Sequence, residues 1–334
     1  MMSGRRGLSV PAPVLVAGEL EGFLQTTDVP SDIAPTLLAP DDPVPRGPFV
    51  GLLPLLVRPI GAEEMDRLPQ LRVVANYGVG YDNIDIAAAR ARGVGVSNTP
   101  GALTIATAEL TWTLMLAAAR RLPEGTSLAR SGSWRGWHPT QLLGMGLDGR
   151  VLGIVGAGRI GTEVGRRAPA FDMGVVYVSR SRNRILERQA GARRVGMDEL
   201  LATADVVTLH VALTPETTHL IDAAALAAMK PGAILVNTSR GPVVDEDALI
   251  AALEGGTLRS AALDVYEEEP IIPERLRALS NVVLLPHLGS ATERARRGMW
   301  DLAWENLLRG VRFRNLRNAV TPLAPQTPEA GEGA

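Results

Sequence analysis

Residues 151–180 (VLGIVGAGRIGTEVGRRAPAFDMGVVYVSR) constrain the fold of this chain more than any other stretch. An apolar run leads into the turn GAGRIG at 156–161, a segment of helical pattern follows, and a second apolar run closes the stretch. This order of strand, glycine turn, helix and strand is typical of the unit that binds the pyrophosphate of a dinucleotide. Gly156 permits the tight turn, Gly158 lets the backbone approach the phosphates, and Gly161 lets the helix pack on the strand. We therefore predict a dinucleotide site here, with N–H groups at the helix start facing the phosphates.

The bulk composition excludes several classes of protein. The chain has 334 residues, which predicts two domains at about 150 residues each. It has no cysteine, and hence no disulfide, thiol nucleophile or thiolate metal site. Its net charge of −2 argues against a nucleic-acid partner. The longest apolar runs, 50–57 and 113–119, are far shorter than the ~18 residues that span a bilayer, so no membrane partner is expected.

The first residues, MMSGRRGLSVPAPVLVAG, carry an arginine pair before an apolar patch. Two prolines interrupt this patch, which argues against an export signal. We expect a short disordered leader and a cytoplasmic protein.

Residues 1–100 predict a small α/β layer, because short apolar runs alternate there with helical and turn signals. Prolines are dense between 30 and 48 and argue against a long helix in that stretch. A helix is expected over 83–92, with Asp82 as its cap and Gly93 just past its end. The expected strands are 14–17, 49–56, 72–76 and 93–97.

Residues 101–122 give the strongest helix signal, with an apolar surface nearly all round and Pro123 predicted to stop the helix. From 172 to 286, strands and helices keep alternating, which predicts a doubly wound parallel sheet with its ligand site at the carboxyl ends of the strands. A final helix is expected over 291–310. The expected strands are 175–178, 206–211, 233–237, 260–265 and 282–285, and the expected helices are 197–203, 223–229 and 245–254.

Three predicted strand ends carry groups suited to chemistry. Arg240 follows one strand in the segment NTSRG and is placed to bind a carboxylate in bidentate fashion. The acidic segment DVYEEEP follows the next strand, and we interpret Glu267 and Glu268 as solvated. His287 follows a third strand and is placed for proton transfer, whereas His210 is expected to pack beside the cofactor.

Other chemistries lack their sequence signals. No pair of histidines has metal-ligand spacing with a carboxylate nearby, so no metal is expected. No Gly-x-Ser-x-Gly or P-loop sequence occurs, which argues against hydrolases and kinases.

Five ordered motifs together resemble the D-isomer-specific 2-hydroxyacid dehydrogenases, and the resemblance extends over about residues 70–310. They are NTP at 98–100, GIVGAGRIG at 153–161, NTSRG at 237–241, LDVYEEEP at 263–270 and PHLGS at 286–290. Within that family the glyoxylate/hydroxypyruvate reductase branch is the most similar, through NYGVGYDNID at 76–85 and GWHP at 136–139.

The resemblance implies an α/β fold of two Rossmann-like, doubly wound parallel-sheet domains, with the cofactor domain inserted into a smaller substrate domain. The substrate domain would comprise 1–100 and 288–320, the cofactor domain 101–287, and a disordered tail 321–334. The resemblance also implies a homodimer built on the helix that starts at 101.

It further implies that His287 is the general acid for reduction of a small 2-keto acid to the D-2-hydroxy acid. Glu269 would orient the imidazole, Arg240 would bind the substrate carboxylate, and Val79 and Gly80 would offer backbone N–H groups to it. Ser290 completes the implied substrate set. The residues expected around the cofactor are Thr104, Gly156, Gly158, Arg159, Ile160, Gly161, Ser179, Arg180, His210, Val211, Thr217, Thr238, Ser239, Asp264 and Gly289.

The end of the second strand indicates which cofactor is preferred. NAD-binding sites place Asp or Glu there to hold the ribose 2′-OH. This chain has Ser179-Arg180-Ser181-Arg182, which can bind a 2′-phosphate, so NADP is predicted to be preferred and NAD remains possible.

Two other readings stay open. A cofactor-sensing, corepressor-like binding protein could use the same scaffold, and a phosphonate or formate dehydrogenase could use similar residues. For Trp137 and His138, a place in a substrate pocket, from the same or the partner subunit, and packing at an interface are equally compatible with the sequence.

Overall fold

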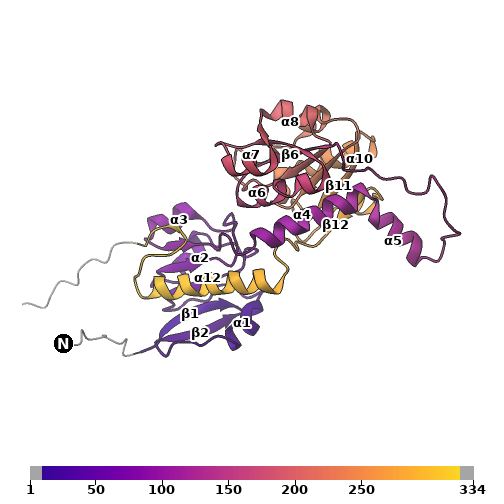
Figure 1. The fold of residues 1–334 in the computed structure, drawn as a ribbon. Helices are drawn as coiled ribbons and strands as arrows, with labels where there is room; N and C mark the ends of the chain where they lie inside the picture. Colours follow the sequence, from indigo (N-terminus) through magenta and orange to yellow (C-terminus); the bar gives the residue numbers. More distant parts are fainter. Residues whose placement is uncertain (1–9, 324–334) are drawn as a thin grey trace, which may run out of the picture. The chain divides into compact units, whose positions relative to one another are not determined.

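The computed structural model describes residues 10–323, which form two compact units (Figure 1). One unit contains the chain up to Leu103 together with the chain from Glu293 onward, and the other is Thr104–Thr292. The second unit is therefore inserted into the first. The boundaries predicted from sequence, after residues 100 and 287, lie a few residues earlier.

The first unit is built on a sheet with the strand order β13-β5-β4-β3-β1-β2, in which β13 alone runs antiparallel among the described strands. Its strands are β1 (Ala12–Ala17), β2 (Ile33–Leu38), β3 (Gly51–Leu53), β4 (Val73–Ala75), β5 (Gly95–Ser97) and β13 (Ala319–Thr321). Its helices are α1 (Glu21–Gln25), α2 (Ala62–Asp66), α3 (Ile86–Ala91) and α12 (Glu293–Val311).

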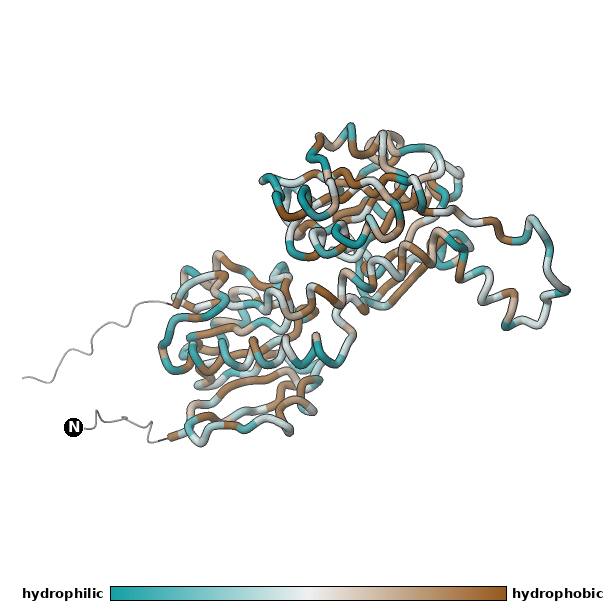
Figure 2. Tube along the Cα trace, viewed as in Figure 1, coloured by the Kyte–Doolittle hydropathy of each residue, from teal (hydrophilic) through white to brown (hydrophobic). Residues whose placement is uncertain are grey.

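Apolar clusters cover both faces of this sheet. Helix α12 packs on one face through Trp300 and Leu307, and Trp300 stacks on Trp304 at 5.4 Å between ring centroids. Helices α2 and α3 cover the other face. Because successive side chains alternate between the faces of a strand, a sheet covered on both sides needs continuous apolar strands. Figure 2 shows hydrophobic residues concentrated along the strands.

The second unit holds an all-parallel sheet with the order β12-β11-β10-β9-β6-β7-β8. Its strands are β6 (Val151–Val155), β7 (Gly174–Val178), β8 (Arg193–Arg194), β9 (Val206–Leu209), β10 (Ala233–Asn237), β11 (Leu258–Leu263) and β12 (Val282–Leu284). Its helices are α4 (Thr104–Ala119), α5 (Leu122–Arg130), α6 (Arg159–Gly165), α7 (Arg184–Ala190), α8 (Met197–Thr203), α9 (Ala223–Ala228), α10 (Glu246–Glu254) and α11 (Glu274–Ala278).

Helix α4 is apolar nearly all round because other elements of the second unit bury it. It lies in the same buried cluster as β6, β7, β10 and α6, and Trp112 stacks on Phe171 at 4.5 Å between centroids. Trp112 also donates its indole N–H to the carbonyl of Val164, at 3.0 Å. The sheet and α6 therefore bury the apolar surface of this helix.

Several sequence predictions need correction. Strand β2 lies in the proline-rich stretch, where Pro35 is tolerated because β2 is an edge strand. Strand β8 consists of two arginines and has no apolar pattern. Thr321 lies in β13 rather than in a disordered tail, whereas 1–9 and 324–334 lie outside the described residues. The helices missed by the sequence are α1, α2, α5, α7 and α11.

Two helix ends also differ from the prediction. Asp85, not Asp82, caps α3, because its carboxylate accepts the N–H of Ala88 at 2.8 Å. Pro123 does not stop the helical region: it lies in the first turn of α5, where proline lacks no needed N–H. The break falls at Arg121, which adopts a left-handed conformation with φ of 55°.

Within residues 10–323, no helix is long and apolar enough to cross a membrane. The same residues contain no group of His, Cys, Asp or Glu side chains arranged to hold a metal ion.

Candidate active site

The candidate residues of the second unit lie at the carboxyl edge of its sheet, in the loops that follow the strands. In sheet order from β12 to β7, these loops carry His287, Glu269, Arg240, His210, the glycine turn and Ser179-Arg180. The carboxyl edge of a doubly wound sheet is where ligands bind.

His287 and Glu269 form a hydrogen-bonded pair in which Nδ1 of the histidine lies 2.7 Å from Oε2 of the carboxylate. Both side chains are partly buried, with 28% and 27% of their surface exposed. Burial raises the pKa of Glu269, but the hydrogen bond and charge of His287, the N–H of Tyr266 and the charge of Arg240 outweigh it and hold this pKa below its usual value. The carboxylate therefore stays ionised and fixes the imidazole with Nε2 as the nitrogen available to a ligand.

The loop that carries His287 is held by Asp264. The two oxygens of the Asp264 carboxylate accept the N–H groups of Leu288 and Gly289, at 2.6 and 2.7 Å, and its carbonyl accepts the N–H of His287 at 2.9 Å. These bonds offset the left-handed backbone of His287, whose φ is 53°. Burial raises the pKa of Asp264 despite the two N–H bonds. Asp264, predicted as a cofactor residue, thus anchors the loop of the candidate general acid.

Arg240 is placed by a compact turn after β10. The amide of Asn237 donates to the carbonyl of Arg240 at 2.9 Å and accepts the N–H and hydroxyl of Ser239. At Gly241 an added Cβ would lie 1.8 Å from the carbonyl of Tyr266, so only glycine fits. The turn and the loop that carries Glu269 therefore pack backbone to backbone, which brings the charge of Arg240 close enough to lower the pKa of Glu269.

Buried threonines tie these loops to α4. Thr107 donates its hydroxyl to the carbonyl of Gly289 at 2.8 Å, and the hydroxyls of Thr111 and Thr238 lie 2.9 Å apart. Thr104 is the first residue of α4, and Ser290 is buried in the loop after β12. Helix α4 thus fixes the backbone on which the candidate residues stand.

The glycine turn has the geometry that a phosphate-binding loop requires. Gly156 has φ of 97°, and an added Cβ there would meet the carbonyl oxygen of His210 at 2.5 Å. A Cβ on Gly161 would meet the carbonyl of Gly156 at 2.2 Å. At Gly158, next to Arg159 and Ile160 at the start of α6, an added Cβ would meet no atom within 4 Å among the described residues beyond its two chain neighbours. The residues present therefore fit a dinucleotide that approaches the backbone at Gly158.

His210 and Thr217 lie in the loop after β9. Nε2 of His210 is 3.0 Å from the hydroxyl of Thr208, and its Nδ1 is buried with no hydrogen-bond partner among the described residues. Burial lowers the pKa of His210 to about 3, so the ring is neutral. Val211 is half-buried beside it. The Thr217 hydroxyl donates to the carbonyl of Ala212 at 2.7 Å and so closes the loop.

The turn after β7 is rich in arginine. The guanidinium of Arg182 pairs with Glu187 at 2.9 Å, and Arg194 donates to the backbone carbonyls of Ser179 and Arg180. The hydroxyl of Ser179 is bonded to the carbonyl of Ser181. Of the four polar side chains predicted here, Arg180 is thus exposed without a carboxylate partner among the described residues, whereas Arg182 is neutralised by Glu187.

Val79 and Gly80 belong to the first unit, in the loop after β4. Asn98 donates its amide to the carbonyl of Val79, and Asn76 donates to the carbonyl of Gly80, both at 2.7 Å. Because a trans peptide points its N–H away from its carbonyl, the Gly80 N–H is directed opposite to the Asn98 amide.

Three contributors escaped the sequence analysis. Asn183 donates to the carbonyl of Ala157 at 2.9 Å and so joins the glycine turn to the turn after β7. Glu267, interpreted as solvated, instead pairs with Nε2 of His219 at 2.6 Å. Arg194 lies on the unpredicted strand β8. Only the asparagine gave a signal, as a helix N-cap residue ahead of α7.

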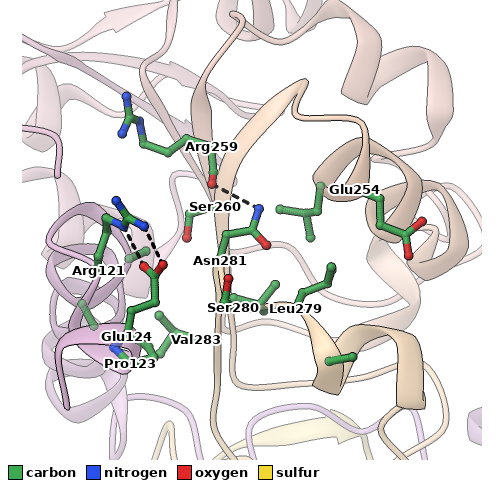
Figure 3. Close-up of a pocket in the computed structure, with 15 residues that line it drawn as sticks. Arg121, Pro123, Glu124, Glu254, Arg259, Ser260, Leu279, Ser280, Asn281 and Val283 are labelled. Atoms are coloured by element: carbon green, nitrogen blue, oxygen red, sulfur yellow. Dashed lines mark hydrogen bonds and ion pairs between the residues drawn. The ribbon is translucent and has the colours of Figure 1, made fainter. Parts of the chain in front are cut away.

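A cavity of about 490 Å³ lies elsewhere, at the amino ends of β11 and β12 (Figure 3). The paired side chains of Arg121 and Glu124 line it, together with Arg259 and Asn281. It contains none of the predicted site residues. The candidate site residues lie at the opposite ends of these strands.

Residues 112–289 match the family described as D-isomer specific 2-hydroxyacid dehydrogenase, NAD binding domain. The glyoxylate reductase of Thermococcus litoralis is 50% identical over 261 residues, which are 77% of this chain and 79% of that protein. The crystal structure of a Thermus thermophilus protein is 45% identical with a TM-score of 0.82, covering 92% of this chain and 100% of the other. An NADPH-dependent glyoxylate/hydroxypyruvate reductase of Sinorhizobium meliloti, solved with NADP and malonate, is 32% identical with a TM-score of 0.84, covering 95% and 99%.

Proposed function

Because this chain belongs to the D-isomer specific 2-hydroxyacid dehydrogenase family, we propose that it reduces glyoxylate, hydroxypyruvate or a similarly small 2-keto acid to the D-2-hydroxy acid. The family makes it an oxidoreductase that uses a nicotinamide cofactor. The observation that carries the proposal is the 2.7 Å pair between His287 and Glu269 beside the loop of Arg240.

The side chains of this protein supply the proton and bind the charged groups of the substrate. A bound reduced nicotinamide supplies a hydride to the carbonyl carbon of the substrate. His287 donates the proton on Nε2 to the carbonyl oxygen, while Glu269 stabilises the positive charge of the imidazolium. Arg240 binds the substrate carboxylate and polarises the keto group. In the reverse direction, His287 acts as the base.

The remaining substrate contacts rest on the family resemblance. In this assignment the N–H groups of Val79 and Gly80 bind the substrate carboxylate, and Ser290 completes the set. The side-chain amides of Asn76 and Asn98 support the roles of Val79 and Gly80, because they donate hydrogen bonds to the carbonyls of these two residues.

The cofactor would be held by the glycine turn, by the loop after β9 and by the turns after β7 and β10. In that arrangement Gly156, Gly158, Arg159, Ile160 and Gly161 would form the turn that binds the pyrophosphate. Thr104, His210, Val211, Thr217, Thr238, Ser239, Asp264 and Gly289 form the part of the pocket toward the nicotinamide.

NADPH is the preferred cofactor in this proposal, and NADH is the weaker one. The turn at Ser179-Arg180 has no carboxylate of its own to repel a 2′-phosphate, and Arg180 is available to bind one. The glyoxylate/hydroxypyruvate reductase of Sinorhizobium meliloti, similar over 95% of this chain, is NADPH-dependent.

A homodimer also forms part of the proposal. Trp134, Trp137 and Leu143 follow α5 and are 56%, 81% and 60% exposed. Large apolar side chains gathered on one exposed segment mark a surface that binds another protein, and a second copy of this chain is the partner we propose. Light scattering after size exclusion tests it, and a monomer at micromolar concentration would contradict it.

A spectrophotometric screen tests the activity. Oxidation of NADPH and NADH is followed at saturating glyoxylate, hydroxypyruvate, pyruvate and bulkier 2-keto acids, with formate and phosphonate substrates tested for reduction of the oxidised cofactors. We expect turnover with the small 2-keto acids and a higher kcat/KM for NADPH. Cofactor binding without turnover on any substrate would favour the corepressor-like reading instead.

A further inference from the structure

Arg194 is the one guanidinium at the β7 turn that bonds to backbone rather than to a carboxylate, within the described chain. Its Nε and Nη2 donate to the carbonyl of Ser179 at 3.1 and 2.8 Å, and Nη2 also donates to the carbonyl of Arg180 at 3.1 Å. These bonds use the three N–H groups of Nε and Nη2. The two N–H groups of Nη1 take part in none of them.

The position of Arg194 follows from the sheet. Strand β8 is the edge strand beside β7, with Arg194 paired to Tyr177. From there the long side chain reaches along β7 to the carbonyls just past its carboxyl end. A second strand thus fixes the turn in which the ribose 2′ position of a dinucleotide is read.

The surrounding charges leave this corner positive. Glu187 is engaged by Arg182 and by the hydroxyl of Tyr177 at 2.7 Å, and these hydrogen bonds lower the pKa of Glu187. Arg180 and Arg194 have no carboxylate partner among the described residues. The turn therefore keeps the positive charges of Arg180 and Arg194, whereas the charge of Arg182 is balanced by Glu187.

We propose that Arg194 is a specificity-determining residue for a 2′-phosphate on the adenosine ribose of the cofactor. It holds the carbonyls of Ser179 and Arg180, so that the Arg180 side chain is presented from a fixed backbone, and it offers Nη1 to the phosphate. A phosphate dianion gains charge-assisted bonds from both guanidinium groups, whereas a 2′-hydroxyl gains little from either. The inference rests on the proposed cofactor preference and extends it to a residue on another strand.

Calorimetric titration of the full-length protein tests the inference, with NADPH, NADH, 2′,5′-ADP and 5′-AMP as ligands. We expect Arg194→Ala to weaken NADPH and 2′,5′-ADP by about tenfold. The affinities for NADH and 5′-AMP should change less than about twofold, because they lack the phosphate. Arg194→Gln should match the alanine variant, and Arg194→Lys should recover part of the affinity through its charge.

The matched control is Arg193→Ala, which removes the neighbouring arginine of β8, a residue whose guanidinium pairs with Glu199 instead. It should leave all four affinities unchanged. The proposal is overturned if Arg194→Ala weakens the phosphorylated and unphosphorylated ligands equally, or if Arg193→Ala has the same effect. If the wild-type protein binds NADH more tightly than NADPH, the proposed preference fails. In that case the 2′,5′-ADP titration still decides the role of Arg194.

Discussion

The two halves of the carboxyl edge of the large sheet are organised by different kinds of contact. In the half formed by β10, β11 and β12, buried or half-buried charges meet dedicated partners, as His287 meets Glu269 and Asp264 meets two backbone N–H groups. In the half formed by β6, β7 and β8, exposed arginines lie at the turn after β7, where Arg182 pairs with the carboxylate of Glu187 and Arg194 donates to backbone carbonyls. The first half is fixed by burial and the second by surface hydrogen bonds.

The contacts of the first half suit catalysis, and those of the second half suit selection of the cofactor. A proton donor must be held within a few tenths of an ångström, which burial and paired charges provide. A phosphate can be recognised by exposed guanidinium groups whose loss leaves the fold intact. Substitutions in the first half are therefore expected to reduce turnover, and substitutions in the second to change cofactor affinity.

The largest effect is expected for His287→Ala. Loss of the proton donor should lower kcat by about 10³-fold. The affinity for NADPH should change little, because the glycine turn and the β7 turn are untouched. Stopped-flow reduction and fluorescence titration measure the two quantities, and an unchanged kcat would end the acid/base assignment.

Glu269→Gln should lower kcat by about 10- to 100-fold, since an amide can orient the imidazole but cannot stabilise its charge. The pKa of Glu269 is lowered in the folded protein, so the stabilisation from its carboxylate is complete above the unfolded pKa of about 4.3. It is lost as the pH falls through the folded pKa.

The free energy of unfolding, measured in urea between pH 7 and pH 3, should therefore fall less steeply at acid pH for Glu269→Gln than for the wild type. Glu268→Gln is the matched control, since Glu268 is the adjacent exposed carboxylate and the contact with His287 is made by Glu269. If the free energy of unfolding falls equally steeply at acid pH in the wild type and in Glu269→Gln, the Glu269 carboxylate does not stabilise the folded protein.

A third effect concerns His210, in the loop after β9, the strand between the two halves. Burial lowers its pKa to about 3, whereas an unfolded histidine has a pKa of about 6.5. Below a pH of about 6.5 the unfolded histidine binds a proton that the folded one does not bind. The free energy of unfolding therefore falls as the pH falls, by up to about 1.4 kcal/mol per pH unit. His210→Gln should flatten this dependence between pH 7 and 5 in urea unfolding, while replacement of the exposed His138 should not.

The smallest effect is expected at Asn183, which caps α7 and bridges to the glycine turn. Asn183→Ala should cost about 1 kcal/mol of stability through loss of the cap. It should weaken NADPH and NADH alike by about threefold, because it acts on the shared turn. Asn183→Asp keeps the cap oxygen but not the amide donor, so stability should recover and affinity should not. A selective loss of NADPH would contradict the division between Asn183 and Arg194.

Local patterns made several parts of the molecule predictable. Buried parallel strands are continuous apolar runs, and the polar residues that end them must lie at one edge of the sheet, which identified Arg240 and His287. Strand β2 was missed because its proline conceals an edge strand, and strand β8 because two arginines carry no apolar signal. The cap of α3 was misplaced by three residues, since Asp82 and Asp85 have the same chemistry and only the backbone selects between them.

What the sequence determined by itself was the dinucleotide turn, the alternating architecture and the strand ends that carry charge, because each is encoded within a few consecutive residues. Only the tertiary structure decided which groups meet across elements. It brought Asp264 under the loop of His287, paired Glu267 with His219, and directed Arg194 from β8 onto the turn after β7. Such contacts join groups far apart in the chain, and no periodicity or spacing encodes them.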